Sequence, residues 1–156
     1  MKQMTFKRLV ESICAVHAKL SAQAARAVNA NLTIRNWLIG MHIAEFELHG
    51  TDRAKYGENI FDELSAKLVR HKVSACGRRQ LYNYQAFYRR YPQIVRTLSA
   101  QSGRLLLSTV NSPVKVRTVS ARFAWDPETL LARLSYSHLE MLVEIDDPLK
   151  RLFYEQ

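Results

Sequence analysis

The sequence predicts an all-α protein, a helical bundle that contains a helix–turn–helix. Apolar residues recur at intervals of three and four along most of the chain, which is typical of amphipathic helices. Helix-capping residues precede several of these stretches. Apolar residues make up 47% of the 156 residues, which is enough for a packed core. We therefore expect a single helical domain over residues 1–156.

Residues 1–58 are expected to form long core helices. Thr5 is a candidate N-cap for a first helix, and Ser21 is a candidate N-cap for a second, longer one. The second half of that longer helix is apolar nearly all round, which is typical of the centre of a bundle. Gly40 within it predicts a close helix crossing, and Gly50 is expected to end it as a left-handed cap.

Residues 59–92 predict the helix–turn–helix. Asn59 and Asp62 form a capping-box-like pair at the start of the first helix. A short break that includes Gly77 follows, and the second helix then continues until Pro92 ends it. Two helices joined by a short turn with glycine outline a helix–turn–helix.

Residues 93–125 form a basic, less regular segment. Two runs rich in β-branched residues, 105–110 and 114–119, predict a small β-hairpin that would act as a wing. This hairpin is the one departure from an otherwise helical prediction.

Residues 126–156 are expected to return to helices. A proline follows an aspartate at Asp126-Pro127 and again at Asp147-Pro148, and each pair is a typical helix start. Between them, Ser137 and Glu140 have the spacing of a capping box. The sequence stops at Gln156 inside an apparent helix, which predicts a longer parent protein.

The positive charge is concentrated in one part of the sequence. The formal net charge is +9, yet the stretch from Leu64 to Trp125 holds 12 Lys and Arg residues and no Asp or Glu, so the rest is acidic by three (9 − 12 = −3). Such segregation is unfavourable through self-repulsion unless a polyanion relieves it. Nucleic acid is therefore the expected partner, and a simple solubility feature is the alternative.

The second helix of the helix–turn–helix is the expected reading element. At 100° per residue, one side carries the core stripe Leu81, Tyr84, Tyr88 and Tyr91. The predicted nucleic-acid-binding residues are Arg78, Arg79, Tyr82, Asn83, Ala86, Arg89 and Arg90, with Lys72 just before the helix. Arginine can contact phosphate or guanine, and asparagine can pair with adenine. The aromatic residues Tyr82, Tyr84, Phe87, Tyr88 and Tyr91 leave stacking on single strands as an alternative.

No catalytic site, metal site or cofactor is expected. A PD-(D/E)XK nuclease needs an acidic residue two positions before a lysine, and no lysine here has one. The pairs Cys14 with His17 and His42 with His49 have helical spacing, but no established ligand motif supports either pair. The glycines are isolated, so no glycine-rich phosphate loop is present. Nor do Ser135, Ser137 and His138 suggest a catalytic triad.

A cytoplasmic, reduced protein is expected. The chain has two cysteines, Cys14 and Cys76, in an otherwise ordinary composition, although the sequence leaves a bond between them open. We find neither a signal peptide nor a continuous apolar stretch of membrane-spanning length. We also expect no membrane partner, on the view that no helix pairs a basic face with an exposed apolar one.

Several short motifs, in order, resemble the N-terminal domain of YhcG-like bacterial proteins. They are Trp37-Leu38-Ile39-Gly40, Arg53-Ala54-Lys55-Tyr56-Gly57, Arg78-Arg79-Gln80-Leu81, Phe87-Tyr88-Arg89-Arg90-Tyr91-Pro92, Leu134-Ser135-Tyr136-Ser137-His138-Leu139 and Asp146-Asp147-Pro148-Leu149-Lys150-Arg151. The resemblance implies a helical domain that precedes a PD-(D/E)XK nuclease domain.

The expected function is therefore binding of nucleic acid, duplex DNA first, to target that nuclease. The alternative is a module that forms a homodimer or docks a protein of a restriction–modification or other nuclease system.

Overall fold

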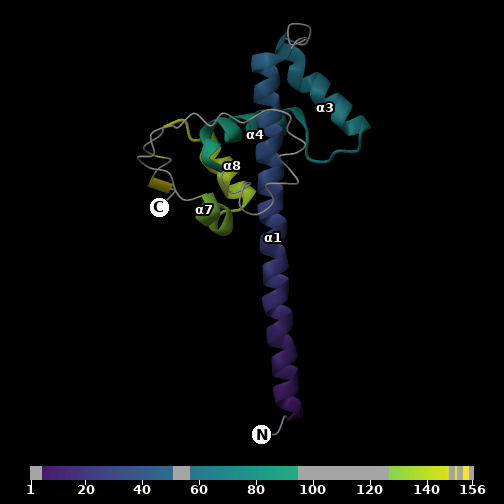
Figure 1. Cartoon of the computed structure of the whole chain (residues 1–156), viewed down its shortest axis with the longest axis vertical. Coiled ribbons are helices and arrows are strands. Elements are labelled where there is room, and N and C mark those ends of the chain that lie inside the picture. The colour runs from purple at the N-terminus through teal and green to yellow at the C-terminus, as the bar shows by residue number, and fades with distance from the viewer. Residues whose placement is uncertain (1–4, 51–56, 95–126, 148–149, 151–152, 155–156) are drawn as a thin grey trace.

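The computed structural model describes residues 5–50, 57–94, 127–147, 150 and 153–154. Within these residues all regular structure is helical, so the predicted all-α class is confirmed. The elements are α1 (Phe6–His49), η1 (Gly57–Asn59), α3 (Ile60–Arg70), α4 (Arg78–Arg90), η2 (Pro92–Ile94), α7 (Pro127–Arg133) and α8 (Tyr136–Glu144). In Figure 1 the shorter helices gather around one half of the long α1. The predicted hairpin wing lies outside the described residues.

Helix α1 is a single helix of 44 residues, so the prediction of two helices with a break at Ser21 is wrong. Thr5 caps its start as predicted, because the Thr5 hydroxyl accepts a hydrogen bond from the backbone N–H of Arg8 at 3.3 Å. No proline or glycine interrupts residues 6–39, and five of residues 22–30 are alanine, the strongest helix former. Helix propensity therefore continues through Ser21, and its capping ability is not used.

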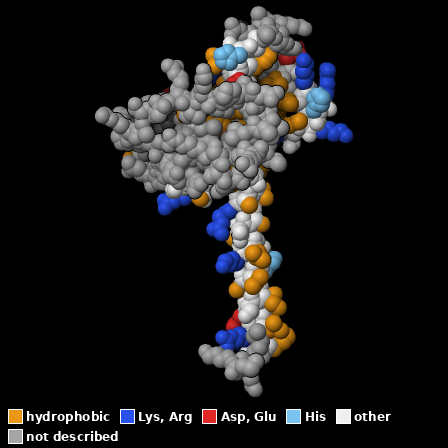
Figure 2. Space-filling model, in the orientation of Figure 1, with side chains coloured by type: hydrophobic (Ala, Val, Ile, Leu, Met, Phe, Trp, Pro, Cys, Tyr) orange, Lys and Arg blue, Asp and Glu red, His pale blue; other side chains and the backbone are white. Residues whose placement is uncertain are grey.

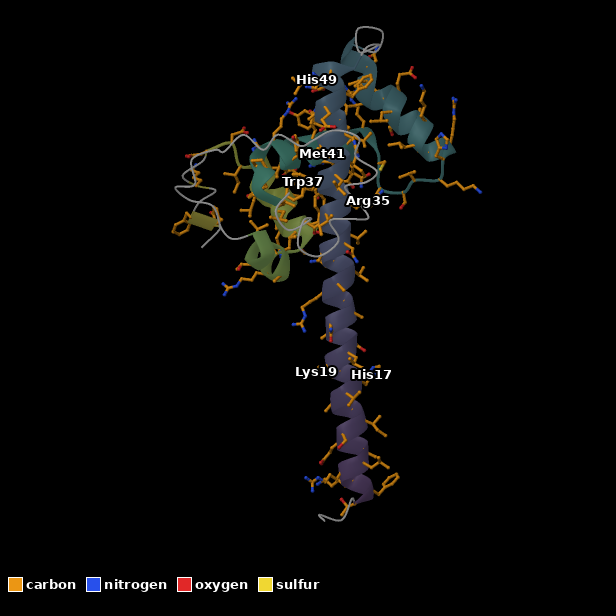
Figure 3. The ribbon with its side chains drawn as sticks, viewed as in Figure 1. His17, Lys19, Arg35, Trp37, Met41 and His49 are labelled. Atoms are coloured by element: carbon orange, nitrogen blue, oxygen red, sulfur yellow. The ribbon has the colours of Figure 1, made fainter. Side chains whose placement is uncertain are left out.

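The two parts of α1 lie in different surroundings. Residues 6–28, called the arm below, are exposed along their whole length and extend away from the other helices (Figure 2). Burial begins at Thr33, where the body of the protein starts. The arm carries exposed apolar residues on one side and basic residues such as Lys19 on another (Figures 2 and 3). The expectation that no helix combines these two features is therefore wrong for the arm.

The core surrounds the second half of α1. Trp37 and Met41 are almost fully buried and contact α4, α7 and α8 through Phe87, Leu130 and Leu139 (Figure 3). A second cluster joins α1, α3 and α4, and its buried members are Ile43, Cys76, Leu81 and Tyr84. The body is therefore built on α1 as a central support.

Gly40 lies where α1 and α4 cross, as predicted. A Cβ atom at this position would overlap the backbone carbonyl of Tyr84, so the crossing requires glycine. The indole N–H of Trp37 donates to the carbonyl of Tyr91 at 2.9 Å and links the same two helices again. At the end of α1, Gly50 has φ −60° and ψ 128°, so the predicted left-handed cap is wrong.

The helix starts agree with the sequence only in part. Helix α7 begins at Pro127, as predicted, and Asp147 accepts a hydrogen bond from the N–H of Lys150 at 3.4 Å. Asn59 precedes α3 but makes no side-chain capping bond. Ser135, not Ser137, caps α8 by accepting from the N–H of His138. Helix α8 therefore begins two residues earlier than the predicted capping box placed it.

The connection between α3 and α4 covers residues 71–77, which is longer than the roughly three- to four-residue turn of a typical helix–turn–helix. Lys72 and Ala75 have positive φ angles of 57° and 55°. Side chains from two helices hold the connection: Arg35 donates to the carbonyl of Ser74 at 2.7 Å, and the Tyr84 hydroxyl donates to that of Ala75 at 2.7 Å. The conformation of the connection is thus supported by side chains of α1 and α4.

Among the described residues, no helix has the length and apolar character that crossing a bilayer requires.

Candidate nucleic-acid interface

Helix α4 lies at the centre of the body, and only part of it faces solvent. The side that contains Leu81, Tyr84 and Phe87 is buried against α1 and the neighbouring helices. The exposed residues of predicted function are Arg78, Arg79, Tyr82 and Arg89, and they are called the α4 strip below. The strip follows one side of the helix from its first turn to its last.

Helix α8 covers the other part of the predicted reading face. Asn83 is buried, and its side-chain amide donates to Glu140 of α8 at 2.8 Å. Ala86 and Arg90 are half-buried. The prediction that these three residues face outward is therefore wrong, because a helix distant in sequence lies on them.

Arg90 connects α4 to the end of α8. Its guanidinium donates to the carbonyl of Val143 and to the carboxylate of Asp146, the latter at 3.0 Å. Only 27% of the Arg90 side chain is exposed, against 83% for Arg79. Arg90 therefore has a structural role that its charge alone did not indicate.

Each arginine of the α4 strip has an acidic neighbour. Arg78 pairs with Asp62 at 3.5 Å, Arg79 with Glu144 at 3.0 Å and Arg89 with Glu47 at 2.8 Å. The three arginine side chains are more than half exposed. Exposed ion pairs contribute only about 0–1 kcal/mol, so a phosphate group can replace the carboxylates at low energetic cost.

Tyr82 is the one predicted stacking residue of α4 that is exposed, at 60% of its surface. Its ring contacts Phe61 of α3 edge-on, with centroids 5.9 Å apart. Tyr84, Phe87 and Tyr91 are buried, and Tyr88 is half-buried against Trp37. Among these aromatic residues, Tyr82 is therefore the one whose ring is accessible for stacking on a base.

Two phenols of this helix, those of Tyr84 and Tyr88, have raised pKa values. Burial raises the pKa of Tyr84, and the nearby positive charge of Arg35 offsets part of that effect. Burial also raises the pKa of Tyr88, and Glu45 adds to the increase. The phenols of both tyrosines are therefore neutral in the folded protein near neutral pH.

Lys72 is exposed in the connection before α4. It lies at a position of positive φ, so its side chain leaves the chain at a bend between the two helices. Five further basic residues of the acid-free stretch lie outside the described residues: Arg96, Arg104, Lys115, Arg117 and Arg122.

A groove runs between α4 and α8 beside the strip. Its volume is about 400 Å³, and its walls include Tyr82, Ala86, Arg89 and the acidic residues Glu144 and Asp146. Both charge signs line it, so it is a weak site for a polyanion as it stands. Sequence reasoning missed these acidic residues, although the i,i+4 spacing of Glu140 and Glu144 could have indicated an acidic face on α8.

Chemistry that depends on clustered ligands is not seen in the described part of the chain. There, no three His, Cys, Asp or Glu side chains gather as they would around a metal ion. Cys14 is exposed on the arm, Cys76 is buried in the core, and both are free thiols.

Comparison with known proteins identifies the family of this chain. A curated relative, "Putative nuclease YhcG" from Escherichia coli (strain K12), is 32% identical over 146 aligned residues. The alignment covers 76% of this chain but 39% of that protein, so the chain spans well under half the length of the relative. No solved structure is significantly similar. The family model described as the DUF1016 N-terminal domain matches residues 12–156, and the chain therefore belongs to the DUF1016 N-terminal domain family.

Proposed function

We propose that this domain binds nucleic acid, duplex DNA in particular, through the α4 strip and Lys72. In this proposal it directs a nuclease domain of the PD-(D/E)XK type, which belongs to the same parent protein. The observation that carries the proposal is the alignment of Arg78, Arg79 and Arg89 on the exposed side of one helix, where each arginine side chain is more than half exposed and pairs with a carboxylate.

The direction of α4 supports the proposal. Arg78 and Arg79 occupy its first turn, where the unpaired N–H groups and the helix dipole also attract anions. Arg89 lies in the last turn of this 13-residue helix. At about 1.5 Å per residue, the strip is roughly 17 Å long, which matches several consecutive phosphates.

The remaining predicted residues take supporting roles in this proposal. Asn83 and Arg90 hold α8 against α4 through Glu140, Val143 and Asp146. Their contribution is to keep the strip rigid. Reading of bases by Asn83 would require α8 to move away.

The nuclease part of the proposal depends on the family. The similar protein is named a putative nuclease, and this chain matches only part of it. In this sequence no acidic residue lies two positions before any lysine. We therefore propose that catalysis belongs to another domain of the parent protein and that this domain supplies affinity for the substrate.

The test is fluorescence anisotropy with labelled duplex DNA, single-stranded DNA and RNA across a salt series. The double variant Arg79→Gln with Arg89→Gln removes two positive charges from the strip. Each lost phosphate contact should reduce the steepness of the salt dependence by about 0.9, so we expect a reduction of about 1.8. The matched control, Lys7→Gln with Arg8→Gln, removes the same charge from the exposed arm.

Equal salt slopes for the strip variant and the wild-type protein would exclude the α4 strip as the binding surface. Equal losses in both double variants would show that binding depends only on net charge. If the wild-type protein binds none of the three nucleic acids at low salt, the alternative of a protein-docking module replaces the proposal.

A further inference from the structure

We propose that the arm, residues 6–28 of α1, pairs with the arm of a second copy of this chain as a two-stranded coiled coil. This inference rests on the arm alone and does not depend on the proposed binding of nucleic acid. Figure 2 shows the arm standing clear of the body with apolar side chains along one side.

The spacing of the exposed apolar residues is that of a coiled-coil seam. Phe6, Leu9, Ile13, Val16 and Leu20 alternate intervals of three and four, which are the a and d positions of consecutive heptads. Phe6 is 82% exposed, and Ile13 and Val16 are 60% and 58% exposed. Single exposed apolar residues are ordinary, but a continuous exposed strip of this kind marks an interaction surface.

The narrowness of the seam favours a partner helix over a lipid surface. Beside the seam lie the polar residues Ser12 and His17 and the apolar residue Val10. The opposite side of the arm carries the small residues Ala15 and Ala18 and the charged residue Glu11. A helix that lies in a membrane interface usually has a broader apolar face with large anchoring residues. A second helix that packs in a coiled coil covers two residues of each heptad, those at positions a and d.

The size of the seam is sufficient for a dimer. Full burial of one such side chain removes roughly 60–120 Å² of apolar surface, by the usual relation between area and transfer free energy. Ten seam side chains, five from each copy, therefore supply roughly 600–1,200 Å². A specific interface needs about 1,000 Å² in total, and flanking atoms such as those of Val10 add to the sum.

Charge does not oppose self-pairing. The basic residues nearest the seam are Lys19 and Arg26, both at g positions. In a parallel pair, heptad geometry places Lys19 opposite Ala24 of the second copy and Arg26 opposite Asn31. In an antiparallel pair whose central layer joins Ile13 to Val16, Lys19 lies opposite Ser12 of the second copy. Neither arrangement brings like charges together across the seam.

The test is the mass of the full chain in solution by sedimentation velocity, at several concentrations. We expect twice the monomer mass of 18.0 kDa for the wild-type protein. Ile13→Glu with Val16→Glu should yield the monomer. The matched control, Ala15→Glu with Ala18→Glu, adds the same charge on the opposite side of the arm and should remain dimeric.

A second seam variant keeps the test valid if glutamates unfold the arm. Ile13→Ala with Val16→Ala preserves helix propensity and should weaken the dimer at least tenfold, with the helical circular dichroism unchanged. A monomeric wild-type protein at high concentration, or a dimer that both seam variants leave intact, would overturn the proposal. A monomer that binds phosphatidylserine vesicles through the same seam would also overturn it, because lipid and not a second copy would then cover the seam.

The Arg79→Gln/Arg89→Gln variant should stay dimeric, which separates this proposal from the proposal on nucleic acid.

Discussion

At the scale of single residues, Gly40 lies at a position that has no space for a side chain. The backbone of α4 passes so close to α1 that even a methyl group at position 40 would overlap the carbonyl of Tyr84. Gly40 predicted this crossing from the sequence, because a glycine in a helix interior otherwise costs about 1 kcal/mol of stability.

We expect Gly40→Ala to lower the free energy of unfolding by about 1–3 kcal/mol, although alanine is the better helix former, because the two helices must separate. Urea denaturation measures the change. Ser21→Ala is the control, since Ser21 lies on the exposed arm and should change stability little. A Gly40→Ala protein as stable as wild type would show that the crossing can relax.

Tyr136 has a buried hydroxyl whose ionisation affects the stability of the fold. Its hydroxyl has no hydrogen-bond partner among the described residues. Burial raises the pKa of Tyr136 far above its ordinary value, and the charges of Glu140 and Tyr84 add to the increase. The folded state therefore favours the neutral phenol.

A raised pKa in the folded state contributes stability that is complete below the unfolded pKa of about 10 and is lost as pH rises above it. We expect the free energy of unfolding of the wild-type protein to decrease between pH 10 and pH 11, and Tyr136→Phe to make that decrease smaller. At pH 7, Tyr136→Phe should be neutral or stabilising, since it removes an unsatisfied hydroxyl. Identical pH profiles by chemical denaturation would contradict this assignment.

At the scale of elements, α1 combines two kinds of helix. Its second half is held by the core, whereas every residue of the arm is exposed and the arm extends away from the tertiary contacts of the other labelled helices (Figure 1). Helices without such contacts exchange their amide hydrogens readily.

In the monomeric Ile13→Glu/Val16→Glu variant, we expect hydrogen exchange to be fast over residues 9–28 and slow over residues 33–49. Mass spectrometry of peptides resolves these two ranges. In the wild-type protein, pairing of the arms should protect residues 9–20. Uniform protection along α1 in the monomeric variant would mean that the arm is stable by itself.

Elements also show where prediction from sequence succeeds and fails. The end of α4 at Pro92 and the start of α7 at Pro127 were predictable, because proline limits the backbone locally. Ser21 failed as a cap because a capping side chain acts only where the helix already ends, and the surrounding alanines continue it. The contact of α8 with Asn83 is a meeting of distant segments that no local periodicity encodes.

At the scale of the whole molecule, the fold partly reverses the charge segregation of the sequence. Arg78, Arg79, Arg89 and Arg90 come from the acid-free stretch, yet each meets a carboxylate from outside it. These carboxylates come from α1, α3, α8 and the residues after α8. The open part of α4 is therefore smaller than the sequence suggested.

The 44-residue length of α1 also defines a distance. At about 1.5 Å per residue, the 23 residues of the arm have a length of roughly 35 Å. One turn of a DNA duplex has nearly the same length, about 34–36 Å. The arm is therefore about as long as one duplex turn, so the first turn of α1 lies that far from the part of α1 that carries the body.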